Sequence, residues 1–346
     1  MEINREIIKL ARQARGFSQK DLASMLQIKQ GTYSKIENEF LSVDEALIEG
    51  LSNALQYPKE FFYQKKEVHL VKGHYRRKLS LPQKEVVKYQ SIMTIVEWNI
   101  EKMMEALDLP AAELPRWDCI KDGEPDLCAQ FLREFWKLPK GRIPNITNLI
   151  ENKGVIVIPI DLGPIDAFSA FSDEGLPLIF VHRSLKGDRY RFNLAHELGH
   201  LIMHFGQKVA EDRDIEEEAH LFASEFLVPG AEIKPYLNNL SLEKLADLKR
   251  YWLVSMQSLI VKAYKHLGVL SKSQYHYLFK KMSIKGYRKN EPIFIPIEKP
   301  DLLPSMIRLH IDELEYSDNE LAEMLNLRQE EFKKYYLNLK TELKIA

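Results

Sequence analysis

Two histidines four residues apart stand in the segment His196-Glu197-Leu198-Gly199-His200. If this segment is helical, positions i and i+4 lie one above the other, and both imidazoles can reach one ion about 2.0–2.1 Å from each. Glu197 lies beside them and would accept a proton from a metal-bound water whose pKa the ion lowers to about 7. The pattern predicts a hydrolytic metal site with His196 and His200 as ligands and Glu197 as general base.

A catalytic zinc ion takes three protein ligands and keeps one position open. A third histidine six residues after the motif would fall on residue 206, which is Gly206. Residues 214–228 predict a helix instead, on which Ala219 and Ala223 share a face with Glu216. Such small residues allow two helices to lie about 8 Å apart. Glu216 is therefore the predicted third ligand and zinc the predicted metal, although manganese or iron could occupy the same ligands.

Other carboxylates and histidines near the motif are weaker candidates. Glu217 and Glu218 are rotated from the predicted ligand by about 100° and 200° around the helix. His204 continues the histidine stripe but lies about 6 Å further along the helix axis, so we expect it to pack or to support a ligand. We expect packing roles for His182 and His220 as well. Two other interpretations stay open: an accidental pair of histidines on a surface helix, and a metal site without turnover.

The N-terminal segment has the pattern of a helix-turn-helix unit. Ser18 can cap a first helix, with Asp21 three residues on, and a turn at residues 27–29 leads into a second helix over residues 30–37. In such units the second helix lies in the major groove of DNA. The side chains predicted to contact DNA are Gln19, at the start of the first helix, and Lys29, Gln30, Thr32, Ser34 and Lys35. A helical bundle that binds protein is the alternative.

The charge distribution permits a nucleic-acid partner. The chain of 346 residues has a net charge of −1, but residues 1–90 hold 16 Lys and Arg against 11 Asp and Glu. The two cysteines, Cys119 and Cys128, match no disulfide framework or ligand spacing, which is typical of a reducing compartment. The sequence has neither an apolar signal segment nor a stretch approaching about 18 apolar residues. We therefore expect a cytoplasmic protein without a membrane partner.

Two families resemble these segments. RFNLAHELGHLIMH at 191–204, followed by EEEAHLFASEFLVP at 216–229, resembles the ImmA/IrrE family of metallopeptidases, and SQKDLASMLQIKQGTYSKIEN at 18–38 resembles the XRE (Cro/repressor-like) helix-turn-helix family. The first resemblance implies a gluzincin-like site with Glu197 as base and a metal on His196, His200 and Glu216. It also implies a substrate class, a repressor or antitoxin-like regulator inactivated by a single cut, which turns on stress, prophage or mobile-element genes.

The middle of the chain combines a run of short strands with helices, whereas both flanks are helical. Short runs rich in branched or aromatic residues predict strands at 154–160, 167–172 and 177–182. We therefore predict a multidomain, mainly α protein. Its expected parts are an N-terminal all-α helix-turn-helix bundle (1–64), a linker and helical region (65–125), a central α+β zincin-like metallopeptidase domain (126–270) and a C-terminal helical region (271–346).

The C-terminal region contains an internal similarity. Residues 317–327 align without gaps with residues 18–28, and Ser, an acidic residue, Leu-Ala and Met-Leu coincide. Further along, Glu330 and Glu331 replace Gly31 and Thr32. This favours a second, degenerate helix-turn-helix unit that contacts protein, because phosphate would repel the acidic helix start. Two ordinary amphipathic helices are the alternative.

The predicted function is that of a zinc-dependent endopeptidase with its own DNA-binding domain, which cleaves a repressor-type regulator. The expected partners are DNA, through residues 1–64, and a repressor or antitoxin-like protein as substrate; a homodimer is compatible with the sequence. The alternative is a helix-turn-helix transcriptional regulator, or an antitoxin-like binding module, whose metal domain senses rather than cleaves. The intact base Glu197 favours the enzyme, because a remnant has no need of it.

Overall fold

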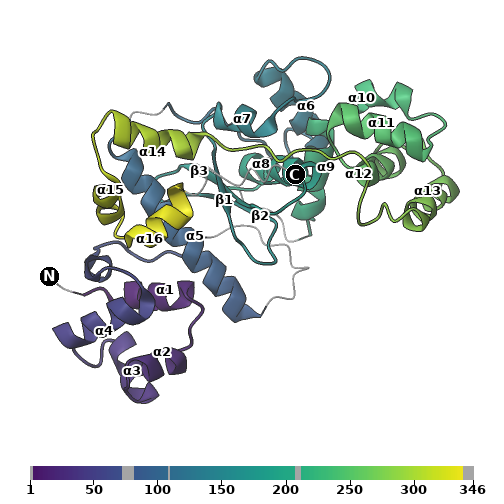
Figure 1. Ribbon diagram of the computed structural model, residues 1–346. Helices are drawn as coiled ribbons and strands as arrows, with labels where there is room; N and C mark the ends of the chain where they lie inside the picture. Colours follow the sequence, from purple (N-terminus) through teal and green to yellow (C-terminus); the bar gives the residue numbers. More distant parts are fainter. Residues whose placement is uncertain (1–2, 72–81, 108–109, 207–211, 338–346) are drawn as a thin grey trace. The chain divides into compact units, whose positions relative to one another are not determined.

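The computed structural model describes residues 3–71, 82–107, 110–206 and 212–337, which form two compact units (Figure 1). Unit 1 combines Met1–Leu109 with Leu302–Ala346, and unit 2 is Pro110–Asp301. Helices dominate both units, and one small sheet lies in unit 2. The protein is therefore multidomain and mainly α, as the sequence predicts.

The N-terminal helices of unit 1 form the expected helix-turn-helix bundle. Its elements are α1 (Arg5–Ala14), α2 (Gln19–Met25), α3 (Gln30–Glu37), α4 (Glu45–Leu55) and a 3-10 turn at Lys59–Tyr63. Ser18 and Asp21 cap α2 reciprocally, so two amide groups that the helix start leaves open are satisfied. Leu22 and Tyr33 have no exposed surface and fix α2 against α3 in the core. The long helix α5 (Gln83–Met104) packs along α1.

The C-terminal helices repeat the order of the N-terminal ones, and α15 and the start of α16 follow α2 and the start of α3 at an offset of 299 residues. α14 (Leu302–Asp312), α15 (Asp318–Met324) and α16 (Gln329–Phe332) correspond to α1, α2 and α3. Ser317 caps α15 in the same reciprocal way as Ser18 caps α2. The turns also agree, because Gln27 and Asn326 both adopt the left-handed conformation, with φ of 55° and 52°. The similarity thus covers three helices, one more than the aligned sequence.

The repeated helices contact the N-terminal ones within unit 1. Arg15 donates from both Nη atoms to the two carboxylate oxygens of Glu331, at 2.6 and 2.8 Å. Arg328 donates to the carbonyl oxygen of Ser52 at 2.7 Å. The acidic start of α16 therefore faces a guanidinium group of the protein.

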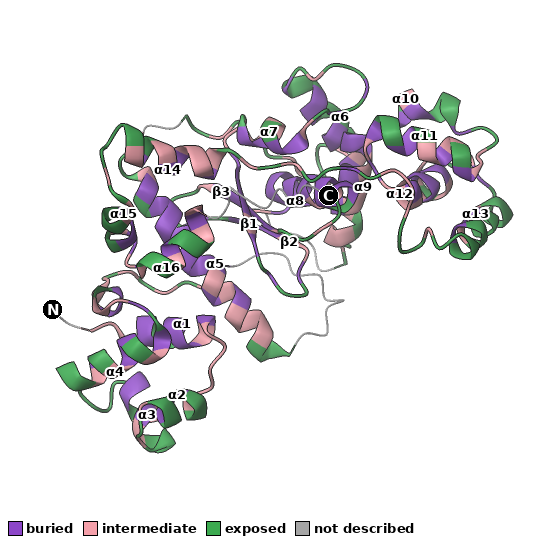
Figure 2. Cartoon of the chain, in the orientation of Figure 1, coloured by how far each residue is buried: buried purple, intermediate pink, exposed green. Residues whose placement is uncertain are grey.

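Unit 2 is built around a three-stranded sheet of order β1-β3-β2. β1 (Ile156–Ile160) runs parallel to β3 (Pro177–His182), whereas β2 (Ala167–Phe171) is antiparallel to β3 and forms an edge. The helices of this unit are α6 (Pro125–Phe135), α7 (Ile146–Glu151), α8 (Gly187–Met203), α9 (Ile215–Leu227), α10 (Gly230–Ile233), α11 (Leu242–Trp252), α12 (Met256–Val261) and α13 (Lys272–Ile284). Most residues of α8 are buried (Figure 2), because β2 and β3 lie beside it as well as α9.

Residues 271–346 do not pack as one region, unlike in the sequence-based division. α13 and the segment up to residue 301 belong to unit 2, where two carboxylates anchor that segment. Glu291 accepts a hydrogen bond from the buried Lys249 at 2.9 Å, and Glu298 accepts from the backbone N–H of Thr147 at 2.8 Å and from Arg191. These contacts hold the segment up to residue 301 against the rest of unit 2.

The helices α8 and α9 approach each other closely at a glycine. A Cβ atom on Gly199 would lie 2.9 Å from Cδ1 of Phe222, a ring with no exposed surface. Ala219 and Ala223 on α9 are fully buried as well. Small residues on both helices therefore set their separation.

Gly199→Ala is expected to destabilise unit 2 by about 1–3 kcal/mol, because the buried Phe222 ring must move to accept the methyl group. Thermal and urea unfolding measure the change. The matched control is Gly31→Ala, a helical glycine whose added methyl group meets nothing within 4 Å. That substitution should be neutral or stabilise by up to about 1 kcal/mol. Equal stability of the two variants would contradict the proposed close packing.

Candidate metal centre

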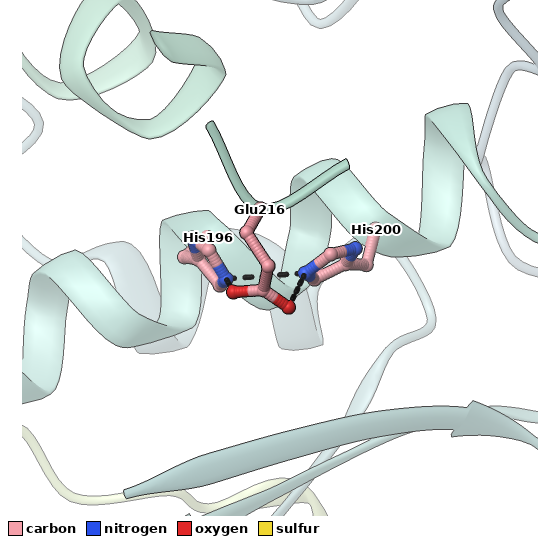
Figure 3. Close-up of side chains that lie close together, drawn as sticks. All are labelled: His196, His200 and Glu216. Carbon is pink, nitrogen blue, oxygen red and sulfur yellow. Dashed lines mark hydrogen bonds and ion pairs between the residues drawn. The ribbon is translucent and has the colours of Figure 1, made fainter. Parts of the chain in front are cut away.

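The helix α8 presents two imidazole rings to the start of α9. The Nε2 atoms of His196 and His200 lie 3.1 Å apart. Glu216, in the first turn of α9, places its Oε2 atom 3.5 Å from Nε2 of His196 and its Oε1 atom 3.7 Å from Nε2 of His200 (Figure 3). Among the described residues these three side chains form a group that could hold a metal ion.

The spacing of the three ligand atoms suits a small divalent ion. In a tetrahedron with metal–ligand bonds of about 2.0–2.1 Å, the ligand atoms stand roughly 3.3–3.4 Å apart. The two imidazole nitrogens are 3.1 Å apart, and each lies 3.5 or 3.7 Å from a different carboxylate oxygen of Glu216, close to this value. Two imidazole nitrogens and one carboxylate are also a donor set that leaves a fourth position open. The residues present therefore fit a catalytic type of metal site.

Glu197 lies outside this group and faces the sheet. Its Oε2 atom accepts a hydrogen bond of 2.6 Å from the hydroxyl group of Ser169 on β2. The carboxyl group is buried, and this burial raises its pKa. A carboxylate with a raised pKa beside the ligands is suited to take up a proton.

A chain of hydrogen bonds supports His200 from behind. Nδ1 of His200 and Nδ1 of His204 are 2.8 Å apart, and Nε2 of His204 is 2.8 Å from Oε2 of Glu218. If His204 is neutral and donates from Nε2 to Glu218, its Nδ1 accepts a hydrogen bond from Nδ1 of His200. His200 then keeps its Nε2 lone pair for a metal ion, which is how outer partners orient metal ligands.

Glu218 is held as a carboxylate at the end of this chain. Arg213 donates from Nε to Oε1 of Glu218 at 2.7 Å. Burial raises the pKa of Glu218, but the hydrogen bonds from Arg213 and His204 outweigh burial and lower the pKa. The expectation that His204 packs or supports a ligand agrees with this geometry.

His220 borders the candidate centre from α9. Its Nδ1 donates to the backbone carbonyl of Glu216 at 2.6 Å, and its ring lies edge-on to His196 with centroids 4.6 Å apart. Within the described residues, the buried Nδ1 of His196 has no hydrogen-bond partner. The two candidate ligand histidines therefore have different hydrogen-bond partners.

The side chains predicted to contact DNA lie at the start of α2 and along α3. Lys29, Gln30 and Lys35 are exposed. Thr32, Ser34 and Gln19 are half-buried, and Gln19 accepts a hydrogen bond of 3.2 Å from Gln30 and donates one of 2.5 Å to Glu37. A side-chain hydrogen bond therefore connects the start of α2 to the start of α3.

Sequence analysis missed Ser169 and Arg213, and it gave Glu218 no supporting role. Ser169 is far from the motif in the sequence, and its role depends on β2 lying beside α8. The sequence places Glu218 on a different face of the helix from Glu216, and in the structure Glu218 meets His204. The stripe of three histidines on α8 was the one available signal for it.

The fold and the candidate centre together define a protein that joins a helix-turn-helix unit to a metallopeptidase-like domain. Residues 150–264 match the family described as IrrE N-terminal-like domain, and residues 8–62 match the helix-turn-helix family. Both matches confirm the resemblances found in the sequence. A comparison with curated proteins finds no match. In the described part of the chain, every helix is too short or too polar to cross a bilayer.

Wild-type protein is expected to take up one zinc ion per chain, and Glu216→Gln should weaken zinc binding by more than about a hundredfold. Loss of a ligand should exceed the 10- to 100-fold cost typical of outer partners. Competition titration with a metal chelator measures the affinity. Glu217→Gln is the matched control, since the Glu217 side chain is 56% exposed and pairs with Lys265. Equal affinities of the two variants would exclude Glu216 as a ligand.

Proposed function

We propose that the protein is a zinc-dependent endopeptidase that carries its own DNA-binding domain. The observation that carries the proposal is the meeting of His196, His200 and Glu216 with Glu197 adjacent to them. When bound, zinc would supply an acidified water and a polarised peptide carbonyl. A metal sensor would need the three ligands but not a buried carboxylate oriented by Ser169.

The chain's own residues would then handle the proton. Glu197 would take a proton from the attacking water and deliver it to the leaving amine, as general base and then general acid. Ser169 donates to one carboxylate oxygen of Glu197 at 2.6 Å, so the other oxygen would take part in the proton transfer. His204 and Glu218 would hold His200 in one tautomer throughout.

An extended peptide is the substrate that this arrangement favours. β2 is an edge strand, paired on one side with β3. A peptide that adds to the edge of a sheet gains main-chain hydrogen bonds, and pockets for alternate side chains provide specificity. Because Ser169 on β2 touches Glu197, a peptide beside β2 would pass the proposed base.

We infer further that the substrate is a repressor-type regulator. The helix-turn-helix unit supports DNA binding by this chain. A protease attached to such a unit would be concentrated at the DNA where repressors are bound. Cleavage there would derepress the neighbouring genes.

Glu197→Gln is expected to abolish cleavage while zinc binding is retained, because the amide cannot take up the proton. The substrate to use is the repressor encoded nearest the gene, incubated with wild type and variant under inducing conditions. Cleavage is followed by mass spectrometry of the products.

Chelator-treated wild type should be inactive and should regain activity with zinc, and Glu217→Gln should cleave normally. Cleavage by both wild type and Glu197→Gln would refute the assigned base. Absence of cleavage by either protein under inducing conditions would refute the assigned reaction.

Lys35→Ala is expected to lower affinity for duplex DNA and to reduce the slope of log K against log[salt] by about 0.9, the effect of one lost phosphate contact. Fluorescence anisotropy with unrelated duplexes at several salt concentrations measures both. Lys59→Ala is the control, because Lys59 donates to Glu45 at 3.0 Å on α4. If the wild type fails to bind duplexes at low salt, the unit does not bind DNA.

A further inference from the structure

A groove of about 620 Å³ lies in unit 1 between the start of α2 and the start of α5. Residues 17–20 and Gln30 line one wall, and Gln83, Lys84 and Val87 line the other. The first two residues of α5, Gln83 and Lys84, are exposed. The groove thus joins the helix-turn-helix face to a helix outside that motif.

The first wall of the groove is where a DNA backbone would pass. In helix-turn-helix units the first residues of the second helix contact base edges, while the first helix crosses the backbone. Gln19 and Gln30 are hydrogen-bonded at 3.2 Å, so the starts of α2 and α3 lie together. A phosphate beside Gln19 would therefore enter the groove.

The second wall is held rigidly against the first. Gly16 turns the chain from α1 into α2 with φ of 72°. The side chain of Lys88 packs there, with Cδ 3.2 Å from the position that a Cβ of Gly16 would take. α5 also packs along α1. The first turn of α5 consequently has a fixed place beside α2.

The charge in the groove is suited to phosphate. Lys20 and Lys84 are exposed, one on each wall. The facing carboxylate of Asp21 is bound in the cap of α2, where it accepts from the backbone N–H of Ser18 at 2.7 Å. This bond lowers the pKa of Asp21, as do the charges of Lys84 and Lys20 to a smaller extent. Glu85, the acidic side chain in the first turn of α5, is half-buried.

We propose that the first turn of α5 is a second DNA-contacting element, in which Lys84, opposite Lys20, binds the phosphate backbone of DNA held by α2 and α3. The proposal rests on the proposed DNA binding of this unit. The contact recognises backbone phosphate and not base sequence.

The test uses the full chain and several unrelated duplexes in fluorescence anisotropy at a series of salt concentrations. Lys84→Gln is expected to weaken binding about three- to tenfold, equally for all duplexes, and to reduce the salt slope by about 0.9. Lys102→Gln, on the last turn of the same helix and paired with Glu105 at 2.6 Å, should change neither.

Three other outcomes each overturn the proposal. If Lys84→Gln binds like wild type while Lys35→Ala does not, the α5 contact is absent and DNA binding by α3 stands. If the loss depends on the duplex sequence, Lys84 reads bases and the assignment to phosphate is wrong. If wild type binds no duplex at low salt, the DNA-binding function itself fails and the α5 contact with it.

Discussion

The close approach of α8 and α9 is the constraint on which the candidate centre depends. Both histidines come from one helix, so their spacing is a local property, but the third donor has to come from another element. Gly199 against Phe222 lets the start of α9 come near enough for Glu216 to reach both imidazoles. Two residues later, Glu218 meets His204 from another face of α9. One helix pair therefore builds both the inner and the outer layer of the centre.

The proposed base is positioned by a different neighbour. α8 lies between α9 and the sheet, and consecutive residues of a helix point about 100° apart. His196 consequently faces α9, while Glu197 faces β2 and Ser169. This separation keeps the proposed base out of the proposed ligand set. It also places the edge of the sheet, where an extended peptide would bind, on the side of the base.

Features that depend on local periodicity could be predicted from the sequence. The four-residue spacing of the histidines, the acidic helix after them and the cap at Ser18 all follow from residues within one or two turns. Ser169 and Arg213 could not be predicted, because their roles depend on how a strand and a loop pack against α8 and α9. The same holds for the division of residues 271–346, which depends on buried pairs such as Lys249 with Glu291. Tertiary packing decides these cases, and no short window of sequence contains it.

The return of the C-terminal helices to the N-terminal bundle affects the order in which the protein can be completed. Arg15 and Ser52 bind Glu331 and Arg328, and Asn99 donates to Tyr336 at 2.8 Å in the interior. Protein chains are synthesised from the N-terminus, and domains generally fold as they emerge. Unit 2 is encoded entirely between the two segments of unit 1, so the ribosome releases it before the residues that cover Arg15. Synthesis of unit 1 thus begins before that of unit 2, but unit 1 can complete its packing only after unit 2 has been synthesised.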